Sequence, residues 1–285
     1  MKGAPVIVLA GADERDLTKL DEYRAAGGYA QLERARGLEP AAIIEELNAA
    51  NLRGRGGAFF PAGRKMQFIP SKEQIPKPHY VCVNADESEP GTFKDREIMN
   101  RVPHRLIEGS LISAYAIDSQ HVFIYIRGEY LDPFESLRAA LDEVRDADLL
   151  GGVTVVLHRG AGAYICGEES GLLESLEGKR GQARSRPPFP AVSGLYASPT
   201  LINNVETIAT IPKILELGVA PHGAVLGELP EIALVGVGED DHVSHREAPG
   251  RFRGRRPPRR SAGGGRRSRR RSASRSRRCT RPRAG

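Results

Sequence analysis

Three short segments of this 285-residue chain combine glycines and charged side chains in a way that suits a ligand site. They are Leu52–Lys65 (LRGRGGAFFPAGRK), Asn84–Arg96 (NADESEPGTFKDR) and Gly160–Ser170 (GAGAYICGEES), called here the first, second and third segments. Glycines at the turn out of a strand let the backbone approach a ligand, and the N–H groups of a following helix face a phosphate or an electron-rich ring. Three such segments predict a large, polar and partly aromatic ligand.

The first segment joins closely spaced glycines to basic and aromatic residues. Its glycines are Gly54, Gly56 and Gly57, and its basic residues are Arg53, Arg55, Arg64 and Lys65. This combination indicates a phosphate cradle with a basic side chain close by. The alternative is a flexible surface loop, because the spacing does not match the dinucleotide-binding fingerprint. The nearby aromatics Phe59, Phe60 and Phe68 favour a ligand site, because a loop exposing them without a ligand would be prone to aggregation.

The second segment places three carboxylates, Asp86, Glu87 and Glu89, directly after an apolar run. No histidine lies nearby and the spacing is not that of a calcium loop, so a metal site is not favoured. Carboxylates at a strand end suit ribose hydroxyls and the amide or imide edge of a nicotinamide or flavin. A solvated acidic turn is the alternative.

In the third segment, two adjacent acids lie at the start of a predicted helix. The helix dipole favours carboxylates there, so one of Glu168 and Glu169 is expected to cap the helix and the other to face a ligand. Cys166 is expected to be a small buried residue rather than a nucleophile.

Charge and cysteine content restrict the class of protein. Residues 246–285 contain 17 Arg and one acid, a net of +16, so the net charge of +6 leaves residues 1–245 at −10. We do not expect nucleic-acid binding, because the body is acidic and the basic tail lacks stacking aromatics. Three distant cysteines fit a reducing compartment, and no apolar run is long enough to span a membrane. A cytoplasmic protein without direct membrane insertion is predicted.

The elements that position these segments alternate between strand and helix patterns. Predicted strands are 80–84, 121–126 and 153–158, and predicted helices are 104–117, 134–144, 168–176 and 205–217. This alternation predicts an α/β fold: a Rossmann-like parallel sheet with helices on both faces and ligands beyond the carboxyl ends of the strands. Residues 1–51 have a helical pattern, residues 231–237 could form a strand, and the basic tail is expected to be disordered.

The three segments, followed by PPFPA and PTLINNVET, occur in an order that resembles the NADH-binding flavoprotein subunit of NADH–quinone oxidoreductases, respiratory complex I. Diaphorase subunits of NAD-linked hydrogenases and formate dehydrogenases are similar. The resemblance runs from about residue 16 to residue 217. It implies an NADH dehydrogenase that transfers hydride to FMN, binds partner subunits carrying iron–sulfur clusters, and reaches the inner membrane only through its complex.

The resemblance also implies roles for particular residues. FMN would be bound by Gly54, Arg55, Gly56, Lys65, Asn84, Asp86, Ser88, Tyr164, Gly167, Glu168, Asn203 and Asn204. NADH would be bound by Phe60, Phe68, Glu89, Glu169, Arg186 and Phe189. No protein nucleophile is needed, because stacking, alignment and electrostatics suffice for hydride transfer to a flavin.

The chain also departs from the family pattern. Phe59 replaces a glycine, which either narrows the pocket or forces a strained backbone. The resemblance implies domains at 1–51 (helical), 52–217 (FMN and NADH binding), 218–245 (remnant of a β-grasp-like domain) and 246–285 (tail). The family's 4Fe-4S site is expected to be missing, because Cys279 stands alone in the tail. The alternative to a working dehydrogenase is a truncated or frame-shifted product without turnover, persisting as a binding or assembly fragment.

Overall fold

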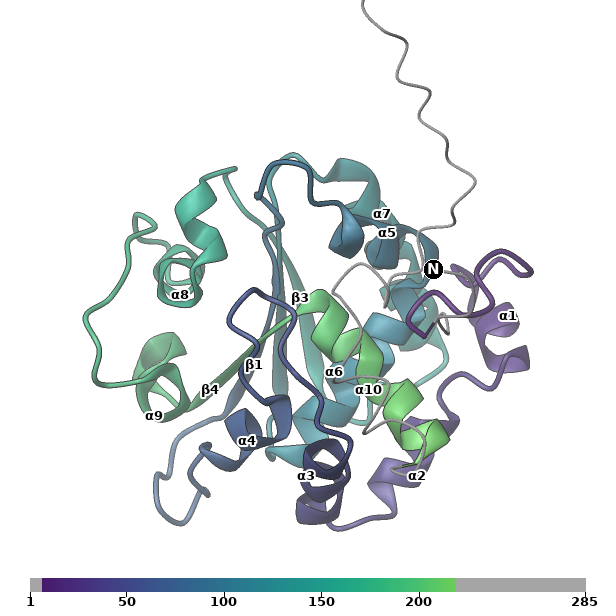
Figure 1. Ribbon diagram of the computed structural model, residues 1–285, viewed down its shortest axis with the longest axis horizontal. Helices are drawn as coiled ribbons and strands as arrows, with labels where there is room; N and C mark the ends of the chain where they lie inside the picture. The colour runs from purple at the N-terminus through teal and green to yellow at the C-terminus, as the bar shows by residue number, and fades with distance from the viewer. Residues whose placement is uncertain (1–6, 219–285) are drawn as a thin grey trace, which may run out of the picture. The chain divides into compact units, whose positions relative to one another are not determined.

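A parallel sheet forms the centre of the computed structural model, which describes residues 7–218 (Figure 1). Its strands are β1 (Tyr80–Ala85), β2 (His121–Ile126), β3 (Thr154–Arg159) and β4 (Thr200–Asn204). They lie in the order β3-β2-β1-β4, and all three neighbouring pairs are parallel. The carboxyl ends of β1 and β4, at the centre and one edge, therefore meet at the same end of the sheet.

Helices cover both faces of this sheet, as predicted. In Figure 1 one face carries α5 (Lys94–Arg101), α6 (Pro103–Ala116), α7 (Leu131–Asp146) and α10 (Val205–Leu217). The other carries α8 (Glu169–Leu176) and α9 (Pro190–Ser193). The α/β Rossmann-like prediction is thus confirmed. Parallel strands need crossover helices, and the apolar face of each helix must pack against the sheet.

Each face of the sheet has its own hydrophobic core. The larger core includes Val81, Val83, Ile124 and residues of α6 such as Leu106. The smaller core lies under α8 and includes Cys82, Tyr125, Leu172, Leu173 and Ile202. Side chains alternate between the two faces along a strand, so Val81 and Val83 of β1 enter the larger core and Cys82 enters the smaller one.

The N-terminal part is helical, as expected, with α1 (Leu20–Ala25), α2 (Ala30–Arg36) and α3 (Pro40–Ala49). Pro40 begins α3, a position where its missing N–H has no helical partner to lose. The predicted strand at 231–237, the β-grasp-like remnant and the basic tail lie outside the described residues.

Four elements were absent from the sequence prediction: α4 (Ala62–Gln67), α5, the short helix α9 and β4. The helix α4 lies inside the glycine-rich first segment, and α5 is mostly polar. The strand β4 ends in two asparagines, which are uncommon in strands, and its identity follows from pairing with β1.

Candidate functional site

A cleft of about 510 Å³ opens at the carboxyl ends of β1 and β4, where the three segments meet. This size is within the range of about 300–1,000 Å³ typical of small-molecule sites. Its lining residues are Arg55, Gly56, Gly57, Asn84, Asp86, Glu87, Ser88, Glu89, Thr92, Lys94, Asp95, Tyr164, Ile165, Gly167, Glu168 and Asn204. Residues far apart in the sequence are therefore brought to one place by the topology.

The first segment is a tied loop rather than a loose one. The Gly54 N–H donates to the Phe60 carbonyl at 2.9 Å, and the Ala62 N–H donates to the Leu52 carbonyl at 2.8 Å. The Arg55 N–H donates to Thr207 Oγ1 in α10 at 2.9 Å. These bonds anchor both ends of the exposed loop 56–60, and Gly56 and Gly57 line the cleft.

Phe59 occupies the turn of this loop with φ at 52°, in the left-handed region that favours glycine. The Phe59 side chain is 42% exposed and does not line the cleft. Of the two consequences expected from Phe in place of Gly, the structure therefore shows the unfavourable backbone conformation and not a narrowed cleft.

The second segment contributes buried polar atoms that have no protein partner. Asp86 Oδ2 and Ser88 Oγ are buried in the wall, where the Ser88 hydroxyl lowers the pKa of Asp86, and neither atom has a hydrogen bond of good geometry within the described residues. The same holds for Nδ2 of Asn203, next to the cleft on β4. Burial raises the pKa of Asp86 to about 6. Buried polar atoms are normally hydrogen-bonded, so this group is suited to a polar ligand.

Glu87, in the same segment, uses its carboxylate for hydrogen bonds within the protein. Its carboxylate accepts the N–H groups of Asp95 at 2.9 Å and Arg96 at 3.1 Å, at the start of α5, and the Tyr130 hydroxyl at 3.1 Å. Burial is the main reason that the pKa of Glu87 is raised. Glu87 thus acts as a helix cap, although it lies in the cleft wall.

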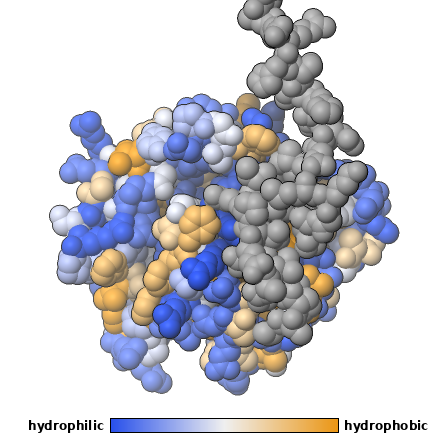
Figure 2. Space-filling view, viewed as in Figure 1, coloured by the Kyte–Doolittle hydropathy of each residue, from blue (hydrophilic) through white to orange (hydrophobic). Residues whose placement is uncertain are grey.

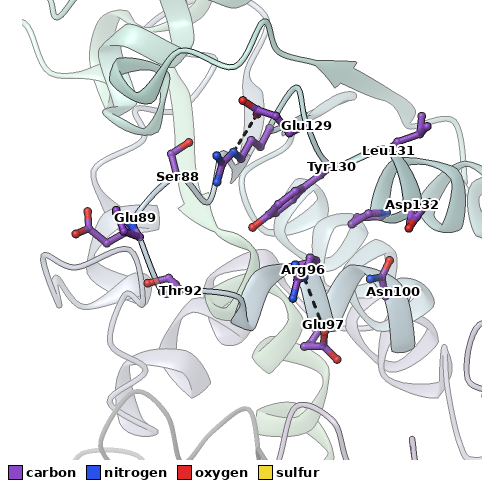
Figure 3. A pocket seen from close by; sticks show the side chains of 14 residues that line it. Ser88, Glu89, Thr92, Arg96, Glu97, Asn100, Glu129, Tyr130, Leu131 and Asp132 are labelled. Atoms are coloured by element: carbon purple, nitrogen blue, oxygen red, sulfur yellow. Dashed lines mark hydrogen bonds and ion pairs between the residues drawn. The ribbon is translucent and has the colours of Figure 1, made fainter. Parts of the chain in front are cut away.

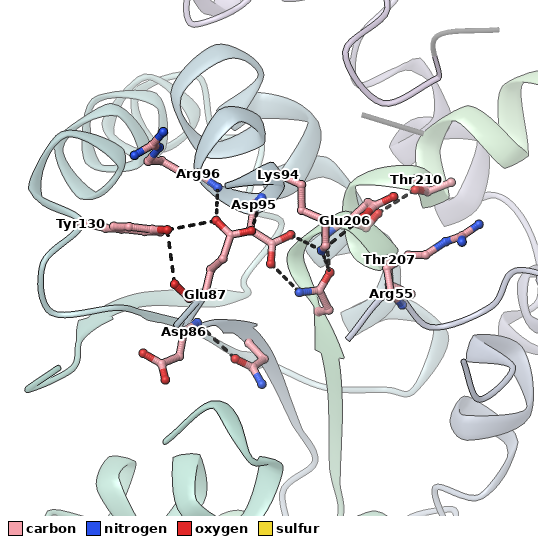
Figure 4. Close-up of polar contacts among 12 residues, drawn as sticks. Arg55, Asp86, Glu87, Lys94, Asp95, Arg96, Tyr130, Glu206, Thr207 and Thr210 are labelled. Atoms are coloured by element: carbon pink, nitrogen blue, oxygen red, sulfur yellow. Dashed lines mark hydrogen bonds and ion pairs between the residues drawn. The ribbon is translucent and has the colours of Figure 1, made fainter. Parts of the chain in front are cut away.

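Lys94 contacts three polar side chains at the floor of the cleft. Its Nζ lies 2.8 Å from Asp95 Oδ1, 3.0 Å from Asn204 Oδ1 and 3.2 Å from Glu206 Oε2 (Figure 4). Asn204 Oδ1 also accepts the Glu206 N–H at 3.0 Å, and Asn204 Nδ2 donates to Asp95 Oδ2 at 2.6 Å. The Asn204 amide therefore joins the starts of α5 and α10, a role that sequence reasoning missed.

In the third segment one of the two acids caps the helix, as expected, and whether the other faces a ligand stays a prediction. Glu168 caps α8 by accepting the N–H groups of Ser170 and Gly171, both at 2.9 Å. Burial opposes ionisation of Glu168, but these bonds and the neighbouring Arg186 hold its pKa below the ordinary value. Glu169 instead points to cations, with Lys65 Nζ and Arg186 Nη1 each 3.0 Å away.

The aromatic residues predicted to contact NADH lie on the surface. Phe60, Phe68 and Phe189 are 44%, 60% and 58% exposed, and the rings of the first two lie 6.0 Å apart. In Figure 2 hydrophobic side chains gather over the region between α4 and α9 of Figure 1. Tyr164 is also exposed, and its hydroxyl donates to Glu89 Oε2 at 2.7 Å at the cleft wall.

The cleft brings together most of the residues predicted to bind a flavin. Those that line it are Arg55, Gly56, Asn84, Asp86, Ser88, Tyr164, Gly167, Glu168 and Asn204; Gly54, Lys65 and Asn203 do not. Of the residues predicted for NADH, only Glu89 lines it, whereas Phe60, Phe68, Glu169, Arg186 and Phe189 do not. Sequence reasoning missed Lys94 and Asp95, although both belong to the second segment.

A second cavity, of about 800 Å³, is lined by residues 88–92 together with residues of α5 and of the segment 127–133 (Figure 3). Arg127 lies in its wall, where Nε donates to Glu129 Oε2 at 2.9 Å and Nη1 donates to the Glu87 carbonyl at 2.8 Å. The Arg127 guanidinium also lies 5.5 Å from the Tyr130 ring centroid. Ser88, Glu89 and Thr92 line both cavities, so this loop is a shared wall.

The described part of the chain contains no group of three or more His, Cys, Asp or Glu arranged to hold a metal ion. Cys82 and Cys166 are both buried and free, and burial raises the pKa of the Cys82 thiol. Neither thiol is placed as a cluster ligand or a nucleophile.

Comparison with known proteins identifies the class to which this fold and cleft belong. Residues 47–213 match the family described as the Nuo51 FMN-binding domain, and the chain belongs to that family.

Individual relatives agree. One NADH-quinone oxidoreductase subunit of Rhizobium meliloti is 52% identical over 223 residues, covering 75% of this chain and 52% of the relative. The corresponding subunit of the Aquifex aeolicus enzyme is 49% identical over 220 residues, covering 74% and 51%. An NAD+-reducing [NiFe]-hydrogenase in the air-oxidised state matches with a TM-score of 0.63 and 39% identity, covering 75% of this chain and 35% of that one.

This chain thus spans about half the length of the curated relatives it matches. Among the described helices, none is both long and apolar enough to cross a membrane.

Proposed function

We propose that this chain binds FMN in the 510 Å³ cleft and acts as the NADH-oxidising module of a larger oxidoreductase. The observation that carries the proposal is the set of buried polar atoms without partners, on Asp86, Ser88 and Asn203. A flavin offers donors and acceptors along its ring and ribityl chain, which suit such atoms. Membership of the FMN-binding family supports the same ligand.

The glycine loop suits the phosphate end of FMN. The backbone of Gly56 and Gly57 lies at the cleft wall without side chains in the way, next to the starts of α5 and α10. Helix starts and exposed backbone N–H groups stabilise anions. Asp86 and Ser88 then remain for the ring or the ribityl chain, and Asn84 keeps the second and third segments in register by donating to the Gly167 carbonyl at 2.8 Å.

NADH is proposed to bind over the open side of the cleft. Glu89 and Tyr164 would meet it at the wall, and Phe60, Phe68 and Phe189 would stack on its rings. Glu169 is held between Lys65 and Arg186, so its carboxylate has a fixed position for a ribose hydroxyl. When bound, FMN supplies the hydride acceptor, and the chain supplies alignment and electrostatics.

The electrons are proposed to leave to iron–sulfur clusters on partner chains and, through them, to quinone. The relatives are named as subunits of NADH-quinone oxidoreductases, and the matched hydrogenase is NAD+-reducing. These assignments extend to a whole assembly, of which this chain covers only a part.

Anaerobic reduction by NADH tests the proposal. Purified protein is loaded with FMN, freed of excess flavin and mixed with NADH under argon. We expect loss of the visible absorption of the bound flavin, and return of that absorption with a soluble electron acceptor. Protein that retains FMN but shows no change with NADH would contradict the dehydrogenase function. It would favour a fragment that only binds.

A further inference from the structure

Glu206, one turn below the cleft floor, is a buried carboxylate with an incomplete set of partners. It is 0% exposed, at the start of α10 and next to the cleft-lining Asn204. Lys94 Nζ lies 3.2 Å from Glu206 Oε2, and no neutral donor reaches either carboxylate oxygen within residues 7–218. A buried carboxylate of this kind stays ionised only at a considerable cost in free energy.

Lys94 cannot compensate Glu206 alone, because its ammonium is shared. Its three N–H donors face Asp95, Asn204 and Glu206, and the Asp95 contact is the shortest at 2.8 Å. The charged groups that face Glu206 are Lys94 and Asp95 from α5 and Arg55 from the first segment. Glu206 and Asp95 therefore compete for the charge of Lys94, and Arg55 adds a weaker attraction.

A phosphate bound at the glycine loop would add negative charge close to these carboxylates. Arg55, Gly56 and Lys94 line the same cleft, and Arg55 is tied through its N–H to Thr207 in the first turn of α10. Protonation of Glu206 would remove one negative charge beside the incoming anion. Nearby groups of like charge in a buried site favour the neutral form of one of them.

We propose that FMN binding is coupled to proton uptake at Glu206: one proton passes from solvent to a Glu206 carboxylate oxygen as the phosphate enters the glycine loop. No bond other than this O–H forms or breaks. The inference rests on the proposed function and identifies Glu206 as the group that makes the binding of a phosphorylated flavin depend on pH.

The electrostatics of the protein without a ligand agree with this coupling. Burial raises the pKa of Glu206 to about 7, against the opposing effect of Lys94. Near and above neutral pH a growing fraction of Glu206 is therefore ionised before the ligand arrives. The proton must then be taken up on binding, so the affinity for FMN falls as the pH rises.

The test compares FMN with riboflavin, which lacks the phosphate, across pH 7 to 9. In this range the phosphate of FMN is already a dianion, since its second pKa is about 6, so its own titration does not contribute. Dissociation constants are measured by flavin fluorescence for the native protein, for Glu206→Gln and for Glu216→Gln. Glu216 lies in the same helix and pairs with Lys213 at 2.6 Å on the surface, so it is the matched control.

For the native protein and Glu216→Gln, we expect FMN affinity to fall about fivefold over this range, corresponding to a pKa of Glu206 that rises by about one unit on binding. For Glu206→Gln it is expected to stay within about twofold, because no titrating carboxyl remains there. Riboflavin binding is expected to be insensitive to pH in all three proteins. The same pH dependence for FMN in Glu206→Gln and in the native protein would overturn the proposal.

Calorimetry measures proton uptake on FMN binding in the native protein, so this test needs no substitution. FMN binding at pH 8 in two buffers with different ionisation enthalpies should show net proton uptake, and no uptake would overturn the coupling even if Glu206→Gln failed to fold. A native protein that binds FMN without pH dependence contradicts only this inference. One that binds no FMN at any pH contradicts the proposed function.

Discussion

Two buried glutamates on neighbouring helices, Glu108 of α6 and Glu206 of α10, have opposite surroundings. Glu108 is 1% exposed and Glu206 is 0% exposed. Glu108 accepts the Tyr23 hydroxyl at Oε2 and the Leu32 N–H at Oε1, the latter at 3.2 Å. Glu206 has no comparable neutral donor among the described residues.

The environment of Glu108 extends into a closed network. The Tyr29 hydroxyl lies 3.0 Å from His104 Nδ1, and His104 Nε2 lies 3.3 Å from Glu143 Oε2. Glu143 also accepts the Leu20 N–H at 2.6 Å. This network attaches the N-terminal helices to α6 and α7 and needs no ligand to complete it.

The two carboxylates differ in their hydrogen-bond partners, and this difference distinguishes a structural role from a role at the ligand site. Both oxygens of the Glu108 carboxylate accept a hydrogen bond from the N-terminal part, and this group holds helices together. Buried atoms without hydrogen bonds also occur away from the cleft, on Gln31, His79 and His104, but those on Asp86 and Ser88 lie in the cleft wall and those on Asn203 and Glu206 flank Asn204, which lines it. The remaining hydrogen-bonding capacity of these four residues is therefore placed where a ligand could use it.

The largest expected effect comes from Glu108→Ala. The substitution leaves the Tyr23 hydroxyl and the Leu32 N–H buried without an acceptor, so we expect a loss of about 3 kcal/mol in the free energy of unfolding. Urea denaturation monitored by circular dichroism measures it. FMN affinity of the folded protein should be unchanged. A loss below about 1 kcal/mol would show that the network does not attach the N-terminal helices.

Asp86→Asn should have the opposite effect on stability. The folded-state pKa of about 6 is above the ordinary 3.8, so stability is complete below about pH 4 and is lost as the pH rises through 6. The neutral amide avoids that loss, and we expect the ligand-free variant to gain about 1–3 kcal/mol at pH 7.5. Its FMN affinity should fall.

Thermal unfolding of both proteins at pH 4 and pH 7.5 gives the comparison for Asp86→Asn. The difference between them should be present at pH 7.5 and small at pH 4. An Asn variant that is less stable than the native protein at pH 7.5 would mean that Asp86 is satisfied by the protein.

Phe59→Gly should stabilise the first segment by about 1 kcal/mol, because glycine adopts a φ of 52° without the steric cost that Phe bears. FMN affinity should change less than about twofold, since Phe59 does not line the cleft. Ala58→Gly, in the same loop and without a positive φ, is the control and should destabilise. A large change in FMN affinity would place Phe59 in the site after all.

Glu169→Gln should have the smallest effect on stability, below about 1 kcal/mol, because the partly exposed ion pairs with Lys65 and Arg186 contribute little. The Michaelis constant for NADH should rise several-fold while flavin content stays intact. Loss of flavin instead would assign Glu169 to the FMN site and would contradict the division between Glu168 and Glu169.

The sequence was sufficient for the architecture where periodicity and apolar runs were strong. The strand at 121–126 and the helix at 205–217 were predicted at their observed bounds, because an unbroken β-type run and an apolar helical pattern leave little ambiguity. The strand β4 was missed, because its polar end is stabilised by pairing with β1 rather than by its own composition.

The segments that form the site were predictable from the sequence, but the roles of individual side chains were not. Glycines and acids marked the three segments, and the resemblance named most of the cleft lining. The separate roles of Asp86 and Glu87, adjacent in sequence, depend on which side chain meets the start of α5. The contact of Lys94 with Glu206 spans more than a hundred residues, so no local pattern indicates it.

The most direct test of the flavin site is a titration of the purified native protein with FMN, set against two glycine variants. Gly56→Val adds a branched side chain to the cleft wall, where a Cβ would already lie 3.5 Å from Asn204 Cβ. Gly37→Ala, at the end of α2 and outside the cleft lining, is the control. We predict one FMN bound per chain in the native protein and in Gly37→Ala, and greatly weakened binding in Gly56→Val. Absence of FMN binding by the native protein, or equal affinity in Gly56→Val, would contradict the assignment of this cleft as the flavin site.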